Sequence, residues 1–309
     1  MILSVTPNPG LDRVVLIPGL VPGQIYEHPR LLTVSAGKGV SMARAARTLG
    51  ADVVCAGFLG GTYGHYHEQL STDEGLKIAW TWIEAETRNC LILVDTVSHK
   101  ATVVNEPGPT VTASDWQRLH TDLLRRSADA DYVTFSGSLP PGSPFEAYAN
   151  LLHDLIQAGT EVWVDTSGEA LRTAMAARPA GIKVNGSEAA ALVGTSADTV
   201  ETAVQAAQDL RSQGIRNVAL TLGEQGAVLV NGQGQWWARP PSIQVASAVG
   251  SGDSFFAGLI TGLSRGLASD EALRWGVAAG AANALSLLAG KFEAAEFEAV
   301  LAKTTVQPV

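Results

Sequence analysis

The chain has 309 residues, of which 46% are hydrophobic and 17% charged, and its formal net charge is −9 at pH 7. This length and hydrophobic content predict a large buried core and exclude an intrinsically disordered protein. The negative charge, without any run of Lys or Arg, argues against nucleic acid or an anionic membrane as a partner. No apolar run is long enough to span a membrane, and the N-terminus lacks a signal-peptide pattern. We therefore expect a soluble, cytoplasmic protein.

The first hundred residues contain several predicted strands with few helices between them. A short strand at 2–5 is followed by a turn at 8–12 and by strands at 13–17 and 30–35. Two more strands, at 89–95 and 101–105, suggest a hairpin around the loop 96–100. We expect these segments to form a small β-sheet lid, made by two excursions, at about 11–36 and 88–107, from a single α/β domain spanning 1–309.

From residue 112 onward, helices and strands alternate regularly. Apolar strands at 132–135, 162–164, 181–184 and 218–222 are separated by helical patterns, which predicts a doubly wound, mostly parallel sheet flanked by helices. The segments 226–230 and 235–238 predict an antiparallel edge. Two late helices are expected at 252–265 and 270–289.

The motif with the clearest chemical meaning is Gly250-Ser251-Gly252-Asp253, which precedes a run of apolar residues at helical spacing. A helix start presents free backbone N–H groups and the positive end of the helix dipole, and glycines allow an anion to approach closely. Asp253 is expected at the mouth of this anion site. An acidic residue in the first turn of a helix is also compatible with ordinary capping.

Other polar groups follow predicted strands or open predicted helices, where ligands of α/β proteins bind. Each is also compatible with a turn, a solvated side chain or a helix cap, and both interpretations stay open from spacing alone. The two residues Asn185 and Glu188 are three apart, so both can turn toward one site and order water around Mg²⁺. The remaining candidates are Gly37, Lys38 and Gly39, Arg88, the loop 136–142 with Ser136 and Gly137, and the glycine turn 222–226.

Three common site types are not supported. The P-loop pattern requires a glycine at position 32, where this chain has Leu32. The dinucleotide-binding G-x-G-x-x-G pattern lacks its third glycine after Gly252, which argues against an NAD-dependent oxidoreductase. The pair His65 and His67 has no Cys or His cluster near it in sequence, which argues against zinc.

Taken together, these motifs resemble those of the PfkB, or ribokinase-like, carbohydrate kinases, in the branch that contains 1-phosphofructokinase and tagatose-6-phosphate kinase. The resemblance runs nearly end to end and rests most firmly on 249–254. It also rests on the motifs Thr6-Pro7-Asn8-Pro9 with Asp12, Ser35-Ala36-Gly37-Lys38-Gly39, Asn105-Glu106-Pro107-Gly108-Pro109, Ser136-Gly137-Ser138-Leu139-Pro140-Pro141-Gly142 and Asp165-Thr166-Ser167-Gly168.

The resemblance implies a ribokinase-like fold and ATP-dependent phosphorylation of a hydroxyl on a ketohexose phosphate. It implies that Asp253 is the catalytic base and that Gly250, Ser251 and Gly252 form an anion hole. The sugar would be held by Asp12, Gly37, Lys38 and Gly39, and Arg88 would meet the phosphate already on the substrate. Mg-ATP would lie near Asn185 and Glu188, in a nucleotide site lined by Thr221, Gly223, Gly226 and Asn283.

Two departures from the family branch concern the acceptor. Ser41 replaces the usual Asn after Gly-Lys-Gly, and Ile92 replaces a frequent lysine. A kinase of an unphosphorylated sugar or nucleoside therefore stays an alternative, as does a sugar- or nucleotide-binding protein without turnover. The sequence leaves the oligomeric state open, a homodimer being one candidate.

Overall fold

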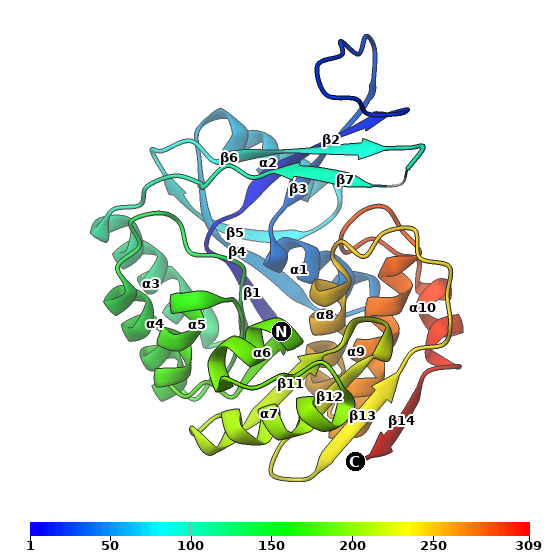
Figure 1. Ribbon diagram of the computed structural model, residues 1–309. Coiled ribbons are helices and arrows are strands. Elements are labelled where there is room, and N and C mark those ends of the chain that lie inside the picture. The colour runs from blue at the N-terminus through cyan, green and yellow to red at the C-terminus, as the bar shows by residue number, and fades with distance from the viewer. Residues whose placement is uncertain (99) are drawn as a thin grey trace.

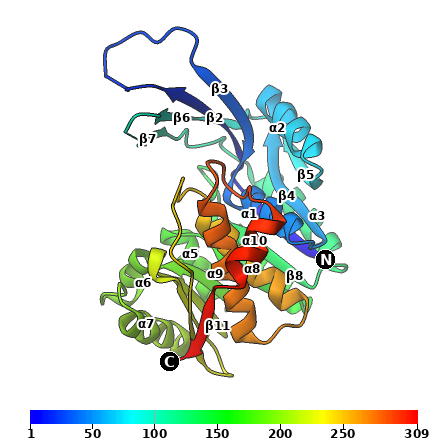
Figure 2. The same ribbon diagram turned by 90° about the vertical axis from the view of Figure 1, so that its right-hand side faces the viewer.

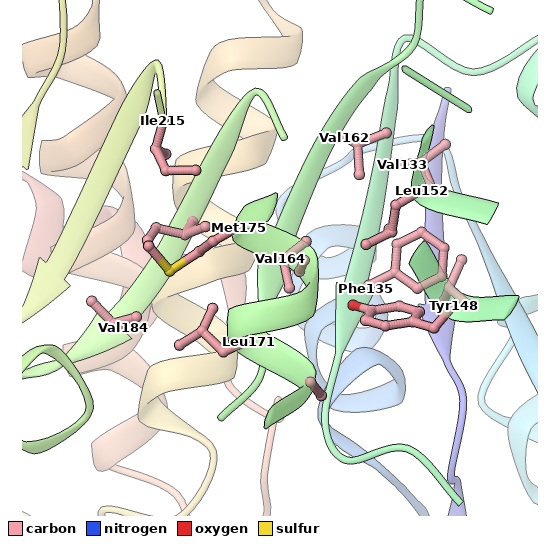
Figure 3. Packing of buried hydrophobic residues seen from close by; sticks show 14 of the residues in the cluster. Val133, Phe135, Tyr148, Leu152, Val162, Val164, Leu171, Met175, Val184 and Ile215 are labelled. Atoms are coloured by element: carbon pink, nitrogen blue, oxygen red, sulfur yellow. The ribbon is translucent and has the colours of Figure 1, made fainter. Parts of the chain in front are cut away.

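The strands of the main sheet are apolar on both faces, and each face is buried under helices. In the computed structural model, which describes residues 1–98 and 100–309, successive strand residues alternate between two hydrophobic clusters. Val162 and Val164 belong to one cluster, for example, and Trp163 to the other. Figure 3 shows part of the first cluster, where Phe135 of the sheet packs against Tyr148 of a covering helix.

The described residues form a ten-stranded sheet that is parallel except at one edge. Its three antiparallel pairings join the last four strands at that edge. In spatial order the strands are β14 (Thr305–Pro308), β13 (Gln235–Arg239), β12 (Ala227–Val230), β11 (Asn217–Thr221), β10 (Gly181–Asn185), β9 (Glu161–Asp165), β8 (Tyr132–Ser136), β1 (Ile2–Thr6), β4 (Val53–Gly60) and β5 (Lys77–Ile83).

Helices cover both faces of this sheet (Figure 1). One face packs against α3 (Ala113–Ser127), α4 (Phe145–Gln157), α5 (Gly168–Ala176), α6 (Gly186–Val193) and α7 (Val200–Ser212). The other face packs against α1 (Lys38–Thr48), α8 (Ser251–Ser264), α9 (Ser269–Ala284) and α10 (Ala294–Leu301). The remaining helical elements are α2 (Gly61–Asp73), which contacts β3 and β5, and the short 3₁₀ turn η1 (Gly223–Gln225).

A separate four-stranded sheet lies beyond one end of the main sheet (Figures 1 and 2). Its order is β3 (Arg30–Ala36), β2 (Gly10–Ile17), β6 (Arg88–Asp95) and β7 (Ala101–Val104). It comes from the two predicted excursions, and the predicted hairpin is the antiparallel pair of β6 and β7. His99, in the predicted hairpin loop 96–100, lies outside the described residues.

The predicted fold class is confirmed: a mostly parallel α/β sheet with flanking helices and a separate small sheet. The antiparallel edge predicted at 226–230 and 235–238 is also confirmed. No helix among the described residues combines the length and the apolar character needed to cross a membrane.

Two boundaries differ from the prediction, and two elements were not predicted. Residues 10–12, predicted as a turn, belong to β2, because β3 and β6 pair with this strand as far as Gly10. The helix predicted at 270–289 ends at Ala284, and the chain turns through Gly290 at a φ of 73°. The elements α10 and β14 were not predicted. A capping box between Glu293 and Glu296 begins α10.

Candidate active site

The loops that carry the predicted site residues meet at one edge of the main sheet. Strands β1, β8, β9, β10 and β11 run parallel, so their C-terminal ends lie on the same side. The register places Ser136 beside Asp165 and Asn185 beside Thr221 at these ends. Helices α1 and α8, which are far apart in sequence, pack side by side (Figures 1 and 2).

Asp165, at the end of β9, binds two lysines. One carboxylate oxygen, Oδ1, accepts a hydrogen bond from Lys38 Nζ at 3.1 Å, and Oδ2 accepts one from Lys183 Nζ at 3.2 Å. Asp165 is fully buried and Lys183 nearly so, whereas the Lys38 side chain is 40% exposed. Burial raises the pKa of Asp165, but the charges of Lys183 and Lys38 more than offset this and hold it below its ordinary value. Both lysines are therefore paired and fixed.

Asp253, in the first turn of α8, has a strongly raised pKa. Burial raises the pKa of this carboxyl most, and the negative charge of Asp165 raises it further. The positive charges of Lys183 and Lys38 offset only part of this rise, so the pKa lies at about 7. A carboxyl with this pKa exchanges a proton near neutral pH. It is therefore suited to general base chemistry.

The turn before α8 has the geometry of an anion site. Gly250 is the N-cap residue in a left-handed conformation, with φ 80°, and no side chain caps the first helical turn. The backbone N–H groups at the start of the helix are thus available to a ligand. The ammonium of Lys183 lies over this turn, 3.0 Å from where a Cβ on Gly252 would stand. Backbone dipoles and one positive charge converge on the same point.

The loop at the start of α1 presses against β1. Gly37 is the N-cap of α1 at a φ of 130°, and a Cβ on Gly39 would collide with Thr6 Oγ1. This close fit directs Lys38 toward Asp165 at the sheet edge. Ser41 follows one turn later, where its N–H donates to Gly37 O at 2.9 Å and its side chain is buried.

The small sheet carries Asp12 and Arg88, and Asp12 lies within range of the charges of Arg88 and of Arg44 in α1. Arg88 and Asp12 lie on the same face because strand residues alternate and Asp12 pairs in register with Cys90. Burial raises the pKa of Asp12, and the charge of Arg88 offsets only part of the rise. Ile92, on the same face, adds no charge.

Several buried polar atoms in this region have no partner among the described residues, among them Arg88 Nε and Ser136 Oγ. Arg88 Nη1 donates to Glu106 O at 3.3 Å. Gly137, next to Ser136, donates its N–H to Asp165 O at 2.9 Å and thereby fixes this loop. Buried polar groups are normally satisfied, so unpaired ones beside a cleft are consistent with a polar ligand.

A cavity of about 950 Å³ lies against the turn formed by residues 250–252, which we call the anion turn, and Ser251 and Gly252 are part of its wall. This volume suits a nucleotide-sized ligand. The sequence-predicted residues on its wall are Asn185, Thr221, Gly223, Gly226, Ser251 and Gly252. Its apolar wall, which sequence reasoning missed, includes Ile243, Val245, Phe255, Val277, Ala281 and Ala284.

Asn185 and Glu188 form a helix cap at the start of α6. Asn185 Oδ1 accepts from the Glu188 N–H, and Glu188 Oε2 accepts from the Asn185 N–H, both at 2.9 Å. The contacts between these two residues are therefore those of a helix cap. Asn185 also lines the cavity, so a cap and a ligand contact are compatible here.

Asn283 is not on the cavity wall. It is fully buried, and its amide accepts from Gly290 N at 2.7 Å and Ser254 Oγ at 3.1 Å and donates to Val249 O at 2.9 Å. Tight packing of α9 against α8 turns this face of α9 inward. Asn283 thus supports the anion turn from behind.

Asp165 and Lys183 were missed as functional residues, although Asp165 begins one of the motifs and Lys183 lies in the predicted strand 181–184. The signal was a charged residue within or directly after an otherwise apolar strand: Val162-Trp163-Val164-Asp165 and Gly181-Ile182-Lys183-Val184. A buried charge in such a strand requires a partner.

The site combines two lysines held by Asp165, a helix start without a side-chain cap, and a carboxyl that titrates near neutral pH. These groups lie beside a nucleotide-sized cavity. Such a combination is typical of a small-molecule kinase. The chain belongs to the pfkB family of carbohydrate kinases, whose model matches residues 16–293. Family membership makes it a phosphotransferase that acts on an alcohol group and implies ATP as the phosphoryl donor.

The relatives agree with this family. The chain is 33% identical over 307 residues to 1-phosphofructokinase of Escherichia coli strain K12, covering 99% of this chain and 98% of that protein. It is similar to the crystal structure of Escherichia coli phosphofructokinase-2 in complex with fructose-6-phosphate, with a TM-score of 0.87, 27% identity and 98% of each chain covered. For the tetrameric inhibited form of that enzyme the TM-score is 0.91 at 28% identity, again over 98% of each chain.

Proposed function

We propose that this protein transfers the γ-phosphoryl group of ATP to a hydroxyl of a ketohexose phosphate of the fructose 1-phosphate or tagatose 6-phosphate type. The observation that carries the proposal is the position of Asp253. Its carboxyl, with a pKa of about 7, lies in the first turn of α8, directly after Ser251 and Gly252 of the cavity wall and within range of the charges of Asp165, Lys183 and the acceptor-loop residue Lys38. A base at this position can serve an acceptor at the α1 loop and a donor in the cavity.

In the proposed mechanism, Asp253 takes the proton of the acceptor hydroxyl as its oxygen attacks the γ-phosphorus. The bond from that phosphorus to the β,γ-bridging oxygen breaks, and ADP leaves with the electron pair. The N–H groups at Gly250, Ser251 and Gly252 stabilise negative charge on the group in transfer. Lys183 lies over the same turn and neutralises charge there.

The acceptor half is assigned to the groups around the α1 loop. Gly37, Lys38 and Gly39 hold the sugar together with Asp12, and Arg88 receives its phosphate through the guanidinium edge that has no described partner. Ser41, Ser136 and Gly137 border the same space. Fixing the acceptor in this way supplies the orientation that phosphoryl transfer requires.

The donor half is assigned to the cavity, with Thr221, Gly223 and Gly226 along the nucleotide. Mg²⁺ with ATP fits this site, because Glu188 uses only Oε2 in its cap and Oε1 has no described partner. Asn185 and Glu188 would hold the ion, mostly through water. Bound Mg²⁺ would neutralise phosphate charge. Asn283, predicted as a nucleotide contact, is assigned instead to support of the turn.

We also propose that residues 1–309 form one domain with the small sheet as a lid, and that a second copy of the chain covers the outer face of this lid. Cross-strand pairing puts Leu91 and Val104 on that face, with Leu31 on the same side. These three side chains are 38%, 55% and 45% exposed. An apolar face of this kind is typical of an interface. The similarity to a tetramer-forming enzyme supports self-association.

A kinase of an unphosphorylated sugar is the second candidate, because Ile92 gives no charge to the acceptor face. The test is ADP release with fructose 1-phosphate, fructose 6-phosphate, tagatose 6-phosphate and the free sugars. We expect turnover with a ketohexose phosphate and a loss of about a hundredfold or more in kcat for Asp253→Asn. Preference for a free sugar would favour the second candidate. Nucleotide binding without ADP release would contradict both.

Arg88→Ala is expected to weaken binding of the sugar phosphate. The lost charge-assisted hydrogen bonds are worth about 1.5–3 kcal/mol, which corresponds to roughly a tenfold to hundredfold higher KM, with a smaller change in kcat. Steady-state kinetics with the best acceptor provide the measurement, and the exposed Arg30→Ala variant in the same sheet is the control. An unchanged KM in Arg88→Ala would remove Arg88 from the phosphate site.

Val104→Asp is expected to dissociate the dimer, because it puts an unpaired charge into the apolar outer face. Sedimentation velocity should then show a dimer for the wild type and a monomer for the variant. Val103→Asp, on the opposite face of the same strand, is the matched control and should stay dimeric. A monomeric wild type at micromolar concentration would contradict the proposed dimer.

A further inference from the structure

A single segment, residues 285–293 between α9 and α10, touches both halves of the site. On one side its backbone presses against the turn before α8, since a Cβ on Gly250 would stand 2.5 Å from Ala289 Cα. On the other side it presses against α1, since a Cβ on Gly290 would stand 3.0 Å from Ser41 Cα. Three pieces of backbone thus lie in direct contact, with this segment in the middle.

Asn283 fixes one side of this contact. Its amide joins Gly290 N to Ser254 Oγ and Val249 O, and these two residues flank the anion turn. The segment and the anion turn are therefore held as one unit. This accounts for only one half of the site.

Arg44, in the middle of α1, fixes the other side. Its guanidinium donates from Nη1 to Ala289 O at 2.9 Å and from Nη2 to Ser35 O at 2.9 Å and Ser35 Oγ at 3.1 Å. Ser35 lies at the end of β3, two residues before Gly37. One buried guanidinium thus joins the strand that leads into the acceptor loop to the segment that supports the anion turn.

Glu74 completes the arrangement. Arg44 Nε donates to Glu74 Oε2 at 2.7 Å, and Lys291 Nζ pairs with Glu74 Oε1 at 2.7 Å. The carboxylate thereby holds Arg44 and Lys291, which lies two residues beyond Ala289. The contacts of this group thus join α1 to β3, to the end of α2 and to the segment 285–293.

We propose that Arg44 is a positioning residue for phosphoryl transfer: it sets the separation between the acceptor loop at Gly37–Gly39 and the anion turn at Gly250. The planar fork of a guanidinium can donate to Ala289, Ser35 and Glu74 in fixed directions at once, which an ammonium cannot. A buried ion pair is weak support for stability, so its role here is geometric. The inference rests on the proposed function, because it concerns the alignment of donor and acceptor.

Alignment errors have a characteristic kinetic result. If the acceptor loop and the anion turn separate, each half still binds its ligand, but the acceptor oxygen no longer meets the γ-phosphorus in line. KM for each substrate should then change little while kcat falls. Water gains access to the phosphoryl group, so ATP hydrolysis per sugar phosphorylated should rise.

The experiment compares Arg44→Lys, which keeps a positive charge beside Glu74 and so favours folding, with Arg44→Met, which removes every hydrogen bond. The control is Arg47→Ala, an exposed residue of the same helix. For each folded variant we would measure kcat, both KM values, and the ratio of ADP released to sugar phosphate formed. Hydrogen–deuterium exchange of residues 249–254, with α7 as an internal reference, gives a readout that does not depend on turnover.

We expect Arg44→Lys and Arg44→Met to lose about tenfold or more in kcat, with KM values within about threefold of the wild type. The ratio of ADP to product should rise and exchange at 249–254 should accelerate, while Arg47→Ala matches the wild type in all readouts. Wild-type kcat, ratio and exchange in Arg44→Lys would overturn the proposal, as would a loss confined to KM. Absence of turnover in the wild type would count against the proposed function instead, and the exchange result would still decide the role of Arg44.

Discussion

The buried ion group centred on Asp165 is the interaction on which the site depends. One fully buried carboxylate receives Lys38 from the acceptor loop and Lys183 from a central strand, so two positive charges stand at defined points at the sheet edge. Without Asp165, both lysines would lose the carboxylate that they hydrogen-bond among the described residues, and the buried charge of Lys183 would face Asp253 alone. The same carboxylate is a negative neighbour of Asp253 and raises its pKa.

This arrangement would allow Asp253, the proposed base, to act near neutral pH. In water the carboxyl of Asp is too acidic to take a proton efficiently from a hydroxyl. Burial and Asp165 raise the pKa of Asp253 to about 7, while Lys183 and Lys38 prevent a larger rise. The proposed base would act in its deprotonated form, so activity should fall as the pH drops through this pKa. The lysines that limit its pKa are also those placed to meet phosphate charge.

The parts of the fold that could be predicted from the sequence are those specified by local residue patterns. The apolar strands such as 132–135 and 218–222 and their intervening helices were readily predicted, because the pattern of an alternating α/β sheet is local. The motif at 249–254 and its neighbours indicated the family, which the comparisons confirm. The end of the helix at Ala284 was not predictable, because its apolar pattern continues while the tertiary contacts of Gly290 turn the chain.

Roles that depend on distant partners were likewise beyond the sequence. Lys38 and Asp165 are 127 residues apart, and Arg44 and Ala289 are 245 apart. Asn283 was predicted to line the nucleotide site, yet the packing of α9 on α8 turns it inward. The specific roles given to the site residues stay proposals until they are tested.

The most direct test of this account is the pH dependence of kcat/KM in the wild type and in Asp165→Asn. In the wild type, kcat/KM should fall as the pH drops through the pKa of Asp253, which gives the profile an acidic limb near pH 7. In Asp165→Asn the negative neighbour of Asp253 is gone and both lysines remain, so the limb should move to lower pH, at a reduced maximum rate. Ionisation of the substrates is common to both proteins and cancels in the comparison. An acidic limb at the same pH in both would contradict the claim that Asp165 tunes Asp253 as the base.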